Sequence, residues 1–167
     1  MKVIDSFEGH YFWLSNFYPS PITYQGITYP TVEHAFQAAK TTDKKEKLLI
    51  AAAESPGQAK RMGRRVALRP DWEKVKEQVM YDCIRLKFND PTLRKQLIGT
   101  YMFALVERNW WHDNCWGSCT CGRCRDRGQN KLGQILMKVR EECINELFAE
   151  HEAAANQVDG KMEEVKA

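Results

Sequence analysis

The stretch from Tyr29 to Lys40, YPTVEHAFQAAK, constrains the fold most because it opens a helix with two unlike faces. Pro30 disfavours helix in the residue before it, and Thr31 is a good N-cap, so a helix is predicted from Thr31 onward. At 3.6 residues per turn, small alanines gather on one side, which favours close packing. The other side carries a carboxylate, an aromatic ring, an amide and an amine, from Glu33, Phe36, Gln37 and Lys40.

Two interpretations of this polar face stay open on spacing alone. It is either a solvated stripe with one ion pair or one wall of a site. Glu33 and Lys40 are seven residues apart, which is two turns and not the usual i,i+4 pair, and spacing by itself favours the solvated stripe. Glu33 also falls in the first turn, where the helix macrodipole favours a carboxylate.

Length and charge limit the class of protein. The chain has 167 residues and 43% hydrophobic residues, enough for one domain with a true core. A net charge of +3 does not indicate strong nonspecific binding of nucleic acid. We find neither a run of apolar residues that could span a bilayer nor a signal peptide, so we expect a cytoplasmic protein without a membrane partner.

The expected elements are mostly helices. The predicted strands cover 2–7, 11–13, a hairpin of 22–24 and 27–29 around Gln25-Gly26, and 101–106. After the helix from Thr31, the predicted helices cover 43–54, opened by Asp43 and stopped by Pro56-Gly57, then 58–65, a long helix through Phe88 capped by Asp71, 93–98, and one from Asn130 to about Glu150. We therefore predict an α+β, helix-dominated single domain over residues 1–150, with a polar, frayed tail over 151–167.

Five separated motifs occur in one order along the chain. They are SNFYPSPI (Ser15–Ile22), YPTVEHAFQAAK, RMGRR (Arg61–Arg65), WEKVKEQVM (Trp72–Met80) and DNCWG…GQNKLGQILMKVR (Asp113–Arg140). Together they resemble the NADAR family over roughly residues 6 to 148. The resemblance implies an N-glycosidase that hydrolyses the bond between a (phospho)ribose or ADP-ribose moiety and a nitrogen heterocycle. Two substrate classes follow from it: ribosylamino-pyrimidine phosphates of riboflavin synthesis, and ADP-ribosylated guanine in nucleic acid.

Two carboxylates and one amine inside these motifs are the predicted catalytic residues: Glu33, Asp113 and Lys40. Cleaving an N-glycosidic bond builds positive charge at the anomeric carbon, which a carboxylate stabilises, while an acid helps the base to leave. For Asp113, a side chain that stabilises a turn is the alternative. Lys40 either pairs with an anionic group or attacks the sugar as a Schiff-base nucleophile, and the sequence does not choose between these roles.

Further motif residues are predicted to bind substrate. The basic cluster with Arg61, Arg64 and Gly63 suits phosphate, although a solvated basic face is the alternative. The rings of Phe17, Trp72, Trp110, Trp111 and Trp116 are candidates to stack on a base, and among them Trp111 is more typical of a core residue than Trp72. Ser15, Asn16, Gln37 and Asn130 complete the predicted binding set.

Four cysteines lie within a ten-residue stretch of the long loop 107–127: Cys115, Cys119, Cys121 and Cys124. Such thiols could bind one zinc ion, with His112 just upstream as a substitute for Cys115, or they could be free thiols. The family pattern is glycine-rich here, so any zinc is expected to be structural, and no cofactor is expected to be required for catalysis. Cys83 and Cys143 fall at apolar helix positions and are predicted to lie in the core.

A second function from another class stays open. A noncatalytic module that binds ADP-ribose or nucleic acid, with zinc fixing the loop, would use the same binding residues. It differs from the enzyme in needing none of Glu33, Lys40 and Asp113. The presence of all three favours the enzyme, whose expected partner is a nucleotide-like small molecule or ADP-ribosylated guanine in nucleic acid.

Overall fold

The computed structural model describes the backbone of residues 2–164 and the side chains of residues 2–155. The first half contains β1 (Lys2–Ile4), a 3₁₀ helix η1 (Gly9–Leu14), β2 (Ile22–Tyr24), β3 (Ile27–Tyr29), α1 (Val32–Ala38), α2 (Lys44–Ala51) and α3 (Pro56–Met62). The second half contains α4 (Trp72–Lys87), α5 (Pro91–Gly99), β4 (Phe103–Leu105), β5 (Arg108–Asn109), β6 (Ser118–Cys119) and α6 (Lys131–Glu164). The predicted α+β, helix-dominated class is confirmed.

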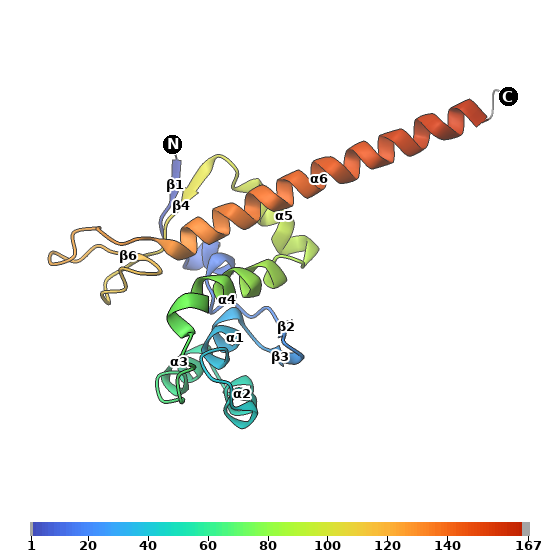
Figure 1. Cartoon of the computed structure of the whole chain (residues 1–167). Helices are drawn as coiled ribbons and strands as arrows, with labels where there is room; N and C mark the ends of the chain where they lie inside the picture. Colours follow the sequence, from blue (N-terminus) through green and yellow to red (C-terminus); the bar gives the residue numbers. More distant parts are fainter. Residues whose placement is uncertain (1, 165–167) are drawn as a thin grey trace.

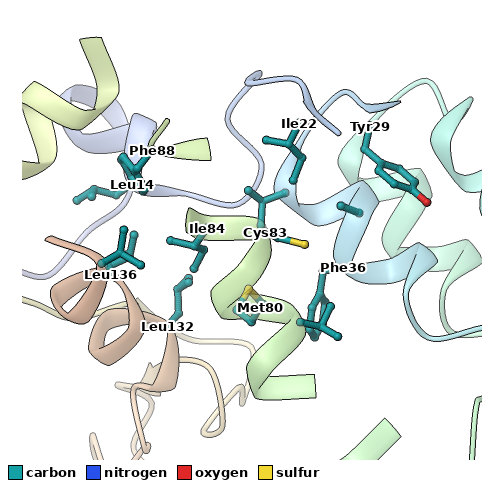
Figure 2. Packing of buried hydrophobic residues seen from close by; sticks show 14 of the residues in the cluster. Leu14, Ile22, Tyr29, Phe36, Met80, Cys83, Ile84, Phe88, Leu132 and Leu136 are labelled. Carbon is teal, nitrogen blue, oxygen red and sulfur yellow. The ribbon is translucent and has the colours of Figure 1, made fainter. Parts of the chain in front are cut away.

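Helix α4 runs through the middle of the core (Figure 1). It packs between α1 and α6, so that Phe36 from α1 lies on one side of it and Leu132 and Leu136 from α6 lie on the other (Figure 2). Its buried face carries Met80 and Ile84, which are four residues apart and so share one side of the helix. One continuous core therefore joins elements from both ends of the chain.

Helix α1 is buried along its whole length. The predicted N-cap is confirmed, since the Thr31 hydroxyl accepts a hydrogen bond from the backbone N–H of His34. Ala35 and Ala38 are fully buried, and α2, α3 and α4 all pack against this short helix. A solvated stripe is excluded, because Glu33 on the polar face is only 6% exposed.

The strands form three pairs in the described part of the chain. β1 pairs with β4 in parallel and β5 with β6 in parallel, whereas β2 and β3 form the predicted antiparallel hairpin. Gln25 and Gly26 both have positive φ, as a tight two-residue hairpin turn requires. The predicted strand over 11–13 is wrong, because this segment is part of the 3₁₀ helix η1.

Two predicted helix boundaries are also wrong. Pro56 does not end a helix but begins α3, where its missing N–H costs nothing and Ser55 caps the first turn by accepting from Gln58 N–H. Asp71 precedes α4 but makes no side-chain cap; its carboxylate instead pairs with Arg69 at 2.6 Å.

The last helix is longer than its predicted end near Glu150. α6 continues to Glu164 and projects beyond the other elements (Figure 1). The domain boundary at residue 150 stays a prediction, and residues 165–167 of the predicted tail lie outside the described part of the chain. Within residues 2–164, the helices are too short or too polar to span a lipid bilayer.

Candidate active site

A cavity of about 750 Å³ opens beside the polar face of α1. Its walls come from α1, from the Ser15–Phe17 loop, and from the segment between Glu107 and Thr120. This volume is typical of sites for drug-sized or nucleotide-sized ligands. Eight residues of the predicted site line it: Ser15, Asn16, Phe17, Glu33, Gln37, Lys40, Asp113 and Trp116.

Glu33 is held by its own helix and by the Ser15–Phe17 loop. The Gln37 amide donates to Glu33 Oε1 at 2.8 Å, and the Glu33 backbone N–H donates to the Asn16 carbonyl at 3.0 Å. Burial raises the pKa of the Glu33 carboxyl, while the positive charge of Lys60 opposes that shift. A carboxyl that is both buried and fixed in orientation is suited to proton transfer.

Lys40 lies at the end of the same polar face. Its Nζ is 5.9 Å from the ring centroids of both Phe36 and Trp72. Burial lowers the pKa of the Lys40 amine, an effect that the carboxylate of Glu33 opposes and that Arg64 reinforces. A larger share of neutral amine makes a lysine more nucleophilic.

Glu107 also lines the cavity, and it was not among the site residues predicted from the sequence. Burial raises its pKa to about 7, and the negative charge of Asp113 adds to the shift. Glu107 lies outside the matched motifs, between β4 and β5. Its only signal in the sequence is a carboxylate that directly follows a predicted strand and opens the long loop.

Asp113 lines the cavity and also stabilises a turn. Its Oδ1 accepts hydrogen bonds from the backbone N–H groups of Cys115 at 3.0 Å and Trp116 at 2.9 Å. The Asn109 side chain holds the Asp113 backbone on both sides, donating to its carbonyl and accepting from its N–H. The predicted site role and the predicted turn role of Asp113 are thus compatible. One carboxylate oxygen stabilises the turn, and the residue lines the cavity.

Aromatic rings form the floor and the rim of the cavity. Phe36 packs edge-on against Trp116 at 5.2 Å and in a tilted arrangement on Trp72 at 5.1 Å. Trp72 is 6% exposed and lies beneath Phe36 as a core residue, so it does not line the cavity. Trp111 was expected to be a core residue, and this is wrong. Trp110 and Trp111 are 69% and 53% exposed at the rim.

The predicted cationic residues fall elsewhere than expected. Arg61 and Arg64 are exposed and are not part of the cavity lining, whereas Lys60 from the same helix is. Asn130 also lies outside the lining: it accepts from Glu107 N–H and donates to the Leu105 carbonyl, and so ties the start of α6 to the β4–β5 connection. The Asn130 side chain therefore has a structural partner on each side.

Of the two residues predicted as the fourth member of the cysteine cluster, His112 and not Cys115 lies beside the other three. The possible ligand atoms of His112, Cys119, Cys121 and Cys124 all lie within 4.8 Å of one another, and Cys115 is not part of this group. The arrangement could hold a metal ion. Cys83 and Cys143 are fully buried core residues, as predicted.

Comparison with known proteins agrees with this geometry. The model of the NADAR domain matches residues 5–144. The chain belongs to the NADAR domain family. The predicted resemblance is thereby confirmed over most of the chain.

Three relatives of this NADAR chain are informative. N-glycosidase YbiA of Escherichia coli (strain K12) is 44% identical over 131 residues, covering 77% of this chain and 79% of the relative. Riboflavin biosynthesis protein VVA0006 of Vibrio vulnificus is 39% identical over 138 residues, covering 81% of this chain but 36% of that longer protein. The NMR structure of E. coli YbiA superposes with a TM-score of 0.75 at 40% identity, covering 89% of each chain. The predicted assignment to the enzymes that hydrolyse N-glycosyl bonds is confirmed at this level.

Proposed function

We propose that this NADAR protein cleaves the N-glycosidic bond between the anomeric carbon of a ribose phosphate or ADP-ribose and a nitrogen heterocycle. One observation carries the proposal. An amine with a lowered pKa, Lys40, opens into the same cavity as two carboxyls with raised pKa values, Glu33 and Glu107. Groups whose environments shift their pKa values toward neutrality in one cavity are the usual signature of acid–base and nucleophilic catalysis.

Lys40 is the proposed nucleophile. Its neutral Nζ forms a bond to the anomeric carbon as the bond from that carbon to the heterocycle breaks. One Nζ proton passes to Glu33, which gives it to the ring oxygen as the sugar ring opens to a protonated imine. Water then adds to the imine carbon, and hydrolysis releases the sugar and restores the amine. The alternative, in which Lys40 only pairs with a substrate phosphate, uses its positive charge and forms no covalent bond.

Glu107 is the proposed acid for the leaving base. A carboxyl with a pKa of about 7 is about half protonated at neutral pH and can give its proton to the departing ring nitrogen. Asp113 keeps a negative charge beside it, which holds the proton on Glu107 and stabilises positive charge on the sugar. This assignment adds Glu107 to the three catalytic residues predicted from the sequence.

The remaining residues of the cavity wall are proposed to bind the substrate. The half-buried ring of Phe17 and the exposed rim tryptophans Trp110 and Trp111 are proposed to stack on the heterocycle, since base–aromatic stacking contributes about 1–3 kcal/mol per base. Lys60, which lines the cavity, is the proposed partner of a substrate phosphate, with Arg61 and Arg64 as more distant positive charges. The proposed reaction uses no metal ion. The sulfur atoms of the cysteine group form a separate cluster beside the cavity.

Both substrate classes fit this arrangement. The name of the Vibrio vulnificus relative supports ribosylamino-pyrimidine phosphates of riboflavin synthesis. ADP-ribosylated guanine, free or within nucleic acid, needs the same anomeric site, phosphate contact and stacking surface. In the rival function, a noncatalytic binding module, the two shifted carboxyls and the amine would have no role.

The test is incubation of the purified protein with ADP-ribosylated guanosine and, in parallel, with the ribosylamino-pyrimidine phosphates. Released base is measured by mass spectrometry. We expect release from at least one substrate class. Binding of both classes without release of base would support the noncatalytic module instead.

A further inference from the structure

The group formed by His112, Cys119, Cys121 and Cys124 has the dimensions of a tetrahedral metal site. His112 Nδ1 lies 3.3 Å from Cys124 Sγ, 3.5 Å from Cys121 Sγ and 3.9 Å from Cys119 Sγ. A zinc ion with Zn–N of about 2.0–2.1 Å and Zn–S of about 2.3 Å has tetrahedral N···S edges of about 3.6 Å. The three observed distances bracket that value.

The backbone at the group is unusual. His112 has a φ of +66°, a left-handed conformation that is uncommon outside glycine, and its ring lies beside the three sulfurs. In the Cys121–Cys124 turn, the Cys124 N–H donates to Cys121 Sγ at 3.4 Å. Such N–H···S bonds favour the thiolate form that metals bind.

A side-chain amide supports the sulfurs from outside the group. Asn114 Nδ2 donates to Cys124 Sγ at 3.1 Å, while Asn114 Oδ1 accepts from the Cys119 N–H at 3.0 Å. One residue thus bonds to two members of the group. Partners of this kind orient metal ligands and raise metal affinity.

We propose that His112, Cys119, Cys121 and Cys124 bind one structural zinc ion, and that this ion fixes the wall of the cavity that carries Trp110, Trp111 and Asp113. Three sulfurs and one imidazole nitrogen complete a four-coordinate shell without an open position for substrate, which is typical of structural zinc. Binding releases the thiol protons of the three cysteines. Cys115, despite belonging to the same loop, is not a ligand.

Only a short stretch of chain connects the proposed metal site to the cavity. His112 lies between Trp111 and Asp113 in sequence, and both of these neighbours line the cavity. On the other side of the group, Thr120 lines the cavity and donates its backbone N–H to the Asn109 carbonyl at 2.8 Å. Asn109 in turn holds the Asp113 backbone. Because β5 and β6 are short, the loop is held mainly by hydrogen bonds such as those of Asn109 and Asp113, and the metal adds a further constraint to them.

The first experiment measures zinc per chain by inductively coupled plasma mass spectrometry, on full-length protein produced with zinc and dialysed. We expect about one zinc in the wild type and in the matched control Cys115→Ser, and less than a tenth of that in Cys121→Ser and in His112→Ala. Circular dichroism shows whether each variant keeps its helices. Loss of metal in Cys115→Ser but not in His112→Ala would overturn the ligand assignment, and so would zinc-free wild type that also fails to take up added zinc.

Cobalt gives a spectroscopic readout of the metal geometry, first in the wild type and then in a variant outside the four ligands. Co²⁺ added to the metal-free wild type should produce the absorption bands of a tetrahedral thiolate site, and Asn114→Ala should weaken Co²⁺ affinity by about 10–100-fold. Spectra of octahedral Co²⁺ with oxygen ligands only would overturn the site.

Hydrogen exchange tests the link to the cavity. Removing zinc with a chelator should speed amide exchange in residues 109–120 and leave α1 protected. Unchanged exchange in 109–120 would overturn the proposed structural role of the ion. None of these measurements uses glycosidase activity, so they stand or fall independently of the proposed reaction.

Discussion

Gly63 lies directly against the side chain of Gln37, so that a Cβ at position 63 would be 2.1 Å from Gln37 Oε1. Gln37 is the residue whose amide donates to the Glu33 carboxyl. The glycine of the RMGRR motif therefore lets the end of α3 approach α1 closely enough to fix the position of Gln37. The sequence had instead suggested that Gly63 belongs to a phosphate-binding cluster.

Gly63→Ala should disturb the Glu33–Gln37 pair. We expect a loss of stability of about 1–3 kcal/mol, as for other overpacked sites, together with a fall in kcat, because Gln37 must move. Gly57→Ala in the same helix is the matched control, since its Cβ would meet only ordinary contacts at 3.8 Å or more. Chemical denaturation measures the stability of each variant, and steady-state kinetics measures its kcat. Equal behaviour of the two variants would contradict this account of Gly63.

Lys60→Ala should raise KM for phosphorylated substrates more than it lowers kcat. A cation that binds substrate and transition state equally contributes to KM alone, and Lys60 is the lysine of α3 that lines the cavity. Arg65→Ala, which removes an exposed charge just beyond α3, is the control and should change KM little. A larger effect at Arg65 would move the phosphate site out of the cavity.

Activity should fall with rising pH above about pH 7 if Glu107 is the acid. Its raised pKa of about 7 means that the protonated form is lost through that value, so log(kcat/KM) should decline with unit slope. Glu107→Gln should have low activity without this decline. The same shift lowers stability: the free energy of unfolding of the wild type, relative to Glu107→Gln, should drop between about pH 4.5 and 7. A decline in kcat/KM that persists unchanged in Glu107→Gln would assign the acid elsewhere.

Lys40→Arg separates the two roles of the amine. If Lys40 attacks the anomeric carbon, the arginine variant should be inactive, since a guanidinium is not a usable nucleophile. Borohydride added to the wild type during turnover should then trap the sugar on the peptide that contains Lys40. An active Lys40→Arg enzyme without a trapped adduct would establish charge pairing as the role of Lys40.

Much of the fold was predictable because it depends on local signals. Thr31, Asp43 and the Gln25-Gly26 turn each specify a boundary through their own hydrogen bonds or backbone angles. The end of α6 was not predictable in this way, since the polar, alanine-rich sequence after Glu150 favours a helix as readily as a tail. Pro56 misled because proline both stops helices and begins them.

The sequence predicted only those neighbours in the candidate site that are also close along the chain. Glu33 and Gln37 lie one turn apart in α1, and Lys40 follows two residues after the end of that helix, so proximity along the chain joins them. Glu107 reaches the cavity only through tertiary structure, in which Asn130 holds the β4–β5 connection, and no spacing in the sequence indicates that arrangement. The tryptophans show the same limit, because exposure is decided by which element covers a ring, and Phe36 covers Trp72.

Glu33 is proposed to take part in cleaving the N-glycosidic bond inside the cavity that it lines. The most direct measurement compares base release by wild type and Glu33→Gln, at equal concentrations of folded protein, with the exposed Glu54→Gln as control. Glutamine has nearly the same shape, so the fold should persist. We predict a loss of about 10²–10⁴-fold in Glu33→Gln, as for removal of a positioned acid–base group, and normal release by Glu54→Gln. Near-native release of base by a folded Glu33→Gln protein would contradict the account.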